Sequence, residues 1–223
     1  TMRKSLILAK KDLKIEFRNR STLNLMFLFS FIILLTFNFA SDPFSTQLRD
    51  IAPGLLWFVL LFAGLLGISK TFIKEIDSGT IEGLKSAPIS YNEILIGKII
   101  YNLTLIIIIE IITFPLFMVL FNYTIAGNIF STLAILTLGS IGFVVVGSFI
   151  SALIIGVQNR GLMLQVIAMP LLIPVIISTI LALREVMIFG KSIFDISEII
   201  FIVGYVLIMA TLSLLLFEYV LEE

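Results

Sequence analysis

The 223-residue sequence contains no cysteine and no histidine, and only 13% of its residues are charged. The lack of cysteine excludes disulfides, thiolate metal sites and a cysteine nucleophile. The lack of histidine excludes a Ser-His triad and histidine-ligated zinc or haem. We therefore predict a non-enzymatic chain with no catalytic, cofactor-binding or metal-binding residues of its own. Its 15 basic and 15 acidic residues balance, so no excess of positive charge points to nucleic acid.

Apolar residues, by contrast, make up 59% of the chain, and its mean hydropathy is +1.15. Soluble domains are about 45–50% apolar and about 25% charged, so this excess predicts burial in a bilayer. A window of about 20 residues separates six apolar stretches. The sequence thus predicts an all-α, polytopic membrane protein, a single transmembrane domain over residues 1–223. The expected spans are approximately residues 23–39, 51–69, 99–121, 129–157, 162–183 and 199–217.

Basic residues are concentrated in alternate connections between these spans. With the N-terminus inside, 12 of the 15 Lys and Arg residues fall on the inner side, and only Arg49, Arg184 and Lys191 fall outside. The positive-inside rule then predicts a multi-pass protein of the cell (inner or plasma) membrane with both termini in the cytoplasm. The N-terminal basic region is too long for a typical signal peptide, so we expect the first span to be retained.

Residues 1–22 form an amphipathic segment that we expect to lie as an elbow helix in the membrane interface. Two interpretations stay open: an anchor attracted to anionic lipid, or a helix that also contacts a partner. One helical face carries Leu6, Ala9, Leu13 and Phe17, and another carries Lys4, Lys11, Lys14 and Arg18.

The segment 70–98 is the longest hydrophilic stretch and contains several helix-ending signals. Gly79 is suited to end a helical extension of the second span, Thr80 to cap a short helix, and Pro88 to stop it. Ser90 and Glu93 predict a capping box before the third span. The segment is either a short rigid helix facing a cytoplasmic partner or a capped loop without one. The candidate coupling residues are Phe72, Ile76, Asp77, Gly79, Thr80, Glu82, Gly83, Leu84, Lys85 and Pro88.

Glu110 lies in the middle of the third span, where a charge is costly unless it faces protein or water. We expect it to bond to a hydroxyl or to an amide such as that of Gln165, or to meet a group on a partner. Glu110 either joins helices or takes part in a transport pathway.

Two further groups of residues stand out within the spans. The glycines Gly139, Gly142 and Gly147 favour close helix packing, and the prolines Pro170 and Pro174 favour a kink or hinge.

Several short motifs resemble known transporter subunits. Residues 77–84 (DSGTIEGL), 87–90 (APIS) and 97–98 (GK) resemble the cytoplasmic segment of export-type ABC transporter membrane subunits, that is, ABC-2-type permeases. Residues 51–57 (IAPGLLW), 159–161 (NRG) and 169–176 (MPLLIPVI) are similar to the haem exporter protein B family, CcmB, of cytochrome c maturation. Residues 11–13 (KDL) and 17–20 (FRNR) agree with this resemblance.

The resemblance implies an ABC-2-like membrane subunit that has no ATPase of its own. ATP and magnesium would bind to a separate cytoplasmic ABC ATPase subunit, which docks on residues 70–98. A second membrane subunit, either a haem-handling protein or a second copy, and a periplasmic-side haem chaperone would complete the assembly. ATP hydrolysis would then drive release of haem or of the haem-loaded chaperone.

Two other functions remain open from the sequence. An ABC-2-type permease of the same architecture exports a lipid, a drug or a polysaccharide. A channel or secondary transporter would need no ATPase and would use Glu110 as an ion or proton site.

Overall fold

The computed structural model describes residues 2–41, 46–71, 89–154 and 160–222, and this part of the chain is helical with no strand. This confirms the predicted all-α class. The helices are α1 (Met2–Asn19), α2 (Ser21–Ala40), α3 (Thr46–Ser69), α6 (Tyr91–Leu120), α7 (Ile129–Leu153), α8 (Arg160–Met187) and α9 (Ser197–Glu222), with a 3-10 turn, η1 (Ile193–Asp195), between α8 and α9.

All the helices except α1 and η1 are long and apolar enough to cross a membrane, which confirms the six predicted spans. The largest difference is at the start of α6, which begins at Tyr91 rather than at residue 99. The helix starts early because the predicted capping box forms at Ser90 and Glu93. At a rise of about 1.5 Å per residue, a helix of 30 residues is about 45 Å long, more than the roughly 30 Å of a hydrocarbon core.

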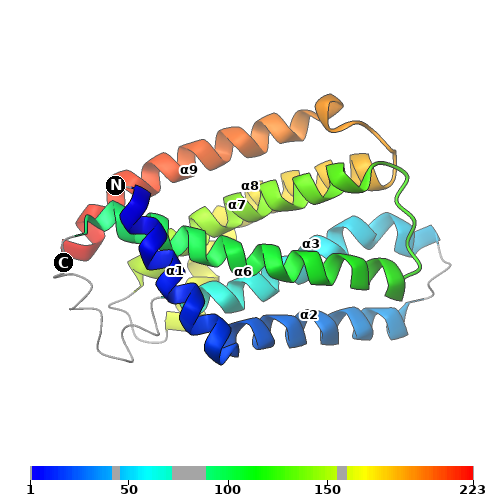
Figure 1. Ribbon diagram of the computed structural model, residues 1–223. Coiled ribbons are helices and arrows are strands. Elements are labelled where there is room, and N and C mark those ends of the chain that lie inside the picture. The colour runs from blue at the N-terminus through cyan, green and yellow to red at the C-terminus, as the bar shows by residue number, and fades with distance from the viewer. Residues whose placement is uncertain (1, 42–45, 72–88, 155–159, 223) are drawn as a thin grey trace.

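The six long helices run side by side, and both chain ends lie at the same end of the bundle (Figure 1). The helices α3 and α7 are central, whereas α2 and α9 are peripheral, and few of their apolar side chains are buried. The core therefore lies around α3 and α7, in contact with α6 and α8. Its largest fully buried apolar side chains include Trp57, Phe117, Phe121 and Phe143.

The helix α1 does not join this parallel array but crosses α6 near the end of the bundle that carries the termini (Figure 1). Its buried residues include Ser5, Leu8 and Ala9. The crossing requires glycine at position 97 of α6. A Cβ atom there would lie 2.9 Å from Leu8 Cδ2 and 3.1 Å from the Ser5 carbonyl oxygen.

Prolines do not break the long helices. Pro170 and Pro174 lie within the continuous helix α8, and Pro53 and Pro115 lie within α3 and α6. Neighbouring helices compensate for the missing backbone donors in transmembrane segments. The proposed hinge at Pro170 and Pro174 therefore stays a prediction.

Candidate functional site

The predicted coupling residues Phe72, Ile76, Asp77, Gly79, Thr80, Glu82, Gly83, Leu84, Lys85 and Pro88 lie outside the described residues. The structure describes the two helix ends that flank them. On one side α3 ends at Ser69 and is followed by a turn at Lys70 and Thr71; on the other side Ile89 and Ser90 lead into α6. The candidate site is thus built from the contacts of these two ends.

The start of α6 is fixed by the predicted capping box. The Glu93 amide donates to Ser90 Oγ at 3.4 Å, and the Ser90 amide donates to Glu93 Oε2 at 3.0 Å. Two of the otherwise unpaired amide groups at the helix N-terminus are satisfied in this way. The chain therefore enters α6 in a defined direction.

The end of α3 is held by a buried hydrogen-bonded chain across three helices. Thr71 Oγ1 donates to Asn102 Oδ1 of α6 at 2.8 Å, and Asn102 Nδ2 donates to Ser148 Oγ of α7 at 2.9 Å. All three side chains are at most 4% exposed. One turn earlier, Ser151 Oγ donates to the Ile68 carbonyl oxygen at 3.3 Å. Thr71, just past the end of α3, is consequently joined through Asn102 to α6, at a point eleven residues after the start of that helix.

We expect the substitution Thr71→Val to destabilise the protein by about 1–3 kcal/mol, because the buried Asn102 Oδ1 loses its donor. Equilibrium unfolding in mixed micelles measures this change. Thr71→Ser should keep most of the stability. The matched control is Thr104→Val, since Thr104 Oγ1 donates within its own helix, to the Ile100 carbonyl oxygen. Equal losses for Thr71→Val and Thr104→Val would contradict a role for the interhelical bond.

The turn between α1 and α2 is organised by the carboxylate of Glu16, which is 1% exposed. Arg20 adopts a left-handed conformation (φ 53°) at the N-cap of α2, and its side chain makes no capping bond. Glu16 Oε1 instead accepts from the amides of Thr22 at 2.5 Å and Leu23 at 3.0 Å, and Oε2 accepts from Thr22 Oγ1 at 2.9 Å. A residue of α1 thereby caps α2, and its negative charge suits the positive end of the α2 dipole.

Two bonds connect α1 to α6 close to Asn102 in the sequence. Tyr101 OH donates to Glu16 Oε2 at 3.3 Å. Lys98 Nζ lies 2.8 Å from Asp12 Oδ2, and the Lys98 side chain is only 2% exposed. Asp12 is 11% exposed and also pairs with Lys11 at 3.1 Å. One turn of α6, residues 98–102, is therefore bonded to α1, α3 and α7; we call it the polar junction.

The polar junction was not predicted from the sequence. Lys98 entered the prediction only as a basic residue of the inner side and as part of the GK motif at residues 97–98, and Glu16 and Asn102 had no predicted role. One local signal was available: Asp12 and Glu16 are four residues apart on an otherwise basic helix, so they lie on one face. Their partners on α6 are more than 80 residues away, and no local pattern identifies those.

Glu110 of α6 is 2% exposed and bonded to two hydroxyl groups of α7. Thr137 Oγ1 donates to Oε1 at 3.1 Å, and Ser140 Oγ donates to Oε2 at 3.2 Å. Of the partner types expected for Glu110, the structure shows hydroxyl groups; the side chain of Gln165 lies outside the described part. These bonds support a role for Glu110 in joining α6 to α7.

The three glycines singled out in α7 each face a neighbouring helix. A Cβ atom at Gly139 would lie 2.6 Å from Thr179 Oγ1, and one at Gly142 would lie 2.9 Å from Val206 Cγ2. At Gly147 it would lie 2.7 Å from Ile68 Cδ1. Larger residues would therefore push α7 away from α3, α8 and α9.

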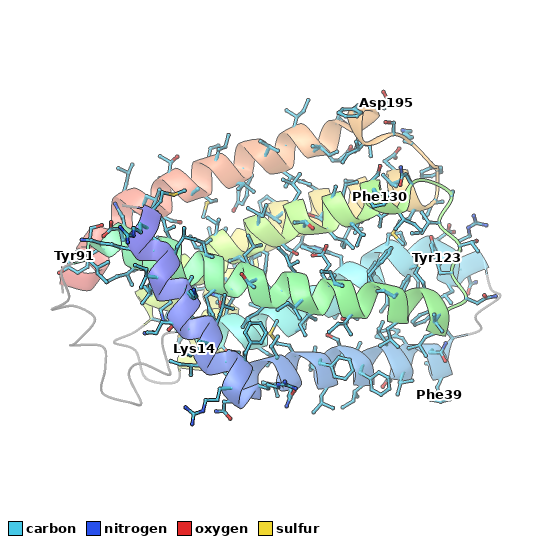
Figure 2. The ribbon with its side chains drawn as sticks, viewed as in Figure 1. Lys14, Phe39, Tyr91, Tyr123, Phe130 and Asp195 are labelled. Carbon is cyan, nitrogen blue, oxygen red and sulfur yellow. The ribbon has the colours of Figure 1, made fainter. Side chains whose placement is uncertain are left out.

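Phe39, Tyr123, Phe130 and Asp195 lie toward the end of the bundle opposite to the termini, whereas Lys14 and Tyr91 lie toward the end with the termini (Figure 2). Lys191 follows α8 and pairs with Glu185. The hydrogen bond and the charge of Glu185 raise the pKa of Lys191 above its usual value. One of the three basic side chains that were predicted to lie outside is thus paired with an acidic neighbour.

Comparison with known proteins gives a family assignment. The family model described as CcmB protein matches residues 3–219. The chain is 28% identical to heme exporter protein B of Rhodobacter capsulatus over 170 residues. This aligned region covers 76% of the present chain and 78% of the relative. It is 28% identical over 173 residues to heme exporter protein B of Pseudomonas aeruginosa (78% and 77%) and 26% identical over 176 residues to that of Paracoccus denitrificans (78% and 80%). With six membrane-crossing helices and a family match over nearly its whole length, the chain is a multi-pass membrane protein that belongs to the CcmB family.

Proposed function

We propose that this chain is the membrane subunit of a haem exporter that acts in cytochrome c maturation. The observation that carries the proposal is the family match over residues 3–219, together with relatives that bear the name heme exporter protein B. In this role the subunit couples ATP hydrolysis by a separate cytoplasmic ABC ATPase to release of haem or of a haem-loaded chaperone. A second membrane subunit completes the assembly.

The composition supports a mechanical role for this chain. None of its 223 residues is a histidine or a cysteine, so it offers neither imidazole nor thiolate to haem iron. In this proposal haem is the substrate of the assembly, and any imidazole or thiolate ligand to its iron comes from another subunit. ATP and magnesium bind to the ATPase subunit, and the present chain converts the movement of that subunit into a movement of helices.

The polar junction supports residues 70–98 as the coupling element. Thr71, just past the end of α3, is joined to α6 through Asn102, and α6 is joined to α1 through Lys98 and Tyr101. A displacement of the segment between these ends would be passed to several helices together, because buried hydrogen-bonded networks resist deformation. The 12 inner basic residues favour an orientation that places this end in the cytoplasm.

The bonding of Glu110 bears on the alternative of an ATPase-independent channel. Both carboxylate oxygens already accept hydrogen bonds from α7, and the carboxylate is buried. This arrangement supports a joint between helices rather than an ion site open to a pathway. The ATP-coupled function is therefore favoured over an ATPase-independent channel.

Substitution of Glu82 by lysine tests the proposed docking of the ATPase. We expect Glu82→Lys to weaken association with the ATPase subunit by about tenfold or more, because a reversed charge at an interface juxtaposes like charges. Co-purification in mild detergent and nucleotide-stimulated binding measure this effect. Asp195→Lys is the matched control, since Asp195 lies at the opposite end of the bundle (Figure 2). Unchanged association for Glu82→Lys would count against residues 70–98 as the docking element.

A further inference from the structure

The helix α1 separates its charges by sign. Its two acidic residues, Asp12 and Glu16, are buried or nearly so and bonded to α6 and to the start of α2. Its basic residues point outward instead. Within the described part of the chain, no ion pair involves the exposed residues Arg3, Lys10, Lys14 and Arg18. The outward face of α1 is therefore positively charged, whereas the two carboxylates of α1 bond to α6 and α2 within the protein.

An apolar stripe runs along α1 beside these basic residues. Met2, Leu6 and Phe17 are 72%, 53% and 49% exposed, and they fall within one sector of the helix at 100° per residue. The face that packs on α6 is a different one, with Ser5, Leu8 and Ala9. Among the described residues, the apolar stripe is thus left largely uncovered.

Two connections fix the depth of α1 relative to the membrane. At its C-terminal end, α2 begins at Ser21, and the 20 residues of α2 are about the number needed to cross the hydrocarbon core. Along its length, α1 crosses α6 at Gly97 and Lys98, and residues 99–120 of α6 are again about enough to cross. Both connections place α1 at the boundary of the apolar layer, across the end of the bundle (Figure 1).

We propose that the outward face of α1, consisting of the apolar stripe and the basic residues beside it, is a binding surface for anionic phospholipids of the inner leaflet. The stripe enters the outer part of the acyl layer, and the Lys and Arg side chains reach the phosphates. Charge complementarity selects this occupant, since every charged side chain on the exposed face is basic.

The attachment of α1 gives this lipid contact a consequence for the rest of the protein. Lys98 and Tyr101 hold α1 on α6, and Glu16 holds it on α2. Anionic lipid that fixes α1 therefore also fixes the first turns of α6. The inference requires only that the α1 end of the bundle faces the inner leaflet, and it is independent of the ATPase.

A fluorescent label on α1 tests the proposal directly. The chain has no cysteine, so Leu6→Cys provides a single site for an environment-sensitive dye. The labelled full-length protein is reconstituted in phosphatidylcholine vesicles with and without phosphatidylglycerol. We expect a blue shift with phosphatidylglycerol that high salt reduces. Each basic side chain at an anionic surface contributes about fivefold in lipid affinity, so Lys10→Gln with Lys14→Gln should lower that affinity by about 25-fold. The double variant should therefore show a smaller shift than the wild type at the same phosphatidylglycerol content.

Two controls make the result decisive. Lys10→Arg with Lys14→Arg preserves the charge and should preserve the shift. Arg49→Gln with Arg184→Gln removes the same amount of charge from the side predicted to lie outside and should also preserve the shift. The proposal is overturned if the emission is the same in both kinds of vesicle, or if the Lys10 and Lys14 variant shifts like the wild type. A change seen only on addition of the ATPase subunit would assign the face to a protein partner and would equally overturn it.

Discussion

Replacement of Lys98 by methionine is expected to destabilise the protein by about 3 kcal/mol. The substitution keeps an unbranched side chain that is one atom shorter, but it leaves Asp12, which is 11% exposed, without the ammonium group 2.8 Å away. Removal of one partner from a buried ion pair costs about 3–5 kcal/mol. We expect the lower end of this range because Lys11 still contacts Asp12. Equilibrium unfolding in mixed detergent micelles measures the difference.

A second substitution shows whether the cost comes from the uncompensated charge. Asp12→Leu combined with Lys98→Met removes both charges, and buried pairs are often replaced by apolar residues with little loss. The double variant should therefore be more stable than Lys98→Met alone. Lys14→Met, an exposed change on the same helix as Asp12, should stay within about 0.5 kcal/mol of the wild type. A Lys98→Met protein as stable as Lys14→Met would show that the ion pair does not hold α1 on α6.

Replacement of Glu16 by alanine should cost about as much, because one carboxylate serves several donors. The amides of Thr22 and Leu23, Thr22 Oγ1 and Tyr101 OH all lose an acceptor at a buried position. Loss of a helix cap costs about 0.5–2 kcal/mol, and each buried donor left unpaired adds about 1–3 kcal/mol where no water reaches it. We expect a loss of at least about 3 kcal/mol in the same unfolding measurement.

Graded substitutions separate the functions of Glu16. Glu16→Gln keeps one acceptor oxygen and should fall between the wild type and Glu16→Ala. Tyr101→Phe removes a single hydrogen bond and should cost only about 1 kcal/mol. If Tyr101→Phe were as damaging as Glu16→Ala, the bond to α6 rather than the cap of α2 would be the main contribution of Glu16.

The features that the sequence predicted well depend on local signals. The six spans follow from runs of apolar residues, and the start of α6 follows from Ser90 and Glu93, which lie three residues apart. Hydropathy alone placed the third span at residue 99, because the first turns of α6 contain Asn92, Glu93 and Lys98. The structure shows that these polar residues belong to the same helix as the span.

The polar junction was not predicted because its contacts are not local. Lys98 meets Asp12 across 86 residues of sequence, and Asn102 joins side chains at positions 71 and 148. The periodicity of α1 was also ambiguous. It indicated a face with Leu6, Ala9, Leu13 and Phe17. The structure leaves Leu6 and Phe17 of this face exposed and buries Ala9, whereas the buried residues of α1 also include the polar Ser5 and Glu16. Amphipathicity identifies an apolar face but not which neighbour covers it.

The rate of ATP hydrolysis by the ATPase subunit, measured in proteoliposomes with and without this chain, tests the proposed coupling most directly. We predict that the chain alone hydrolyses no ATP, that it changes the rate of the ATPase subunit, and that Glu82→Lys abolishes this change while Asp195→Lys preserves it. Hydrolysis or haem release by the chain alone, or an ATPase rate that is the same with and without the chain, would contradict the account.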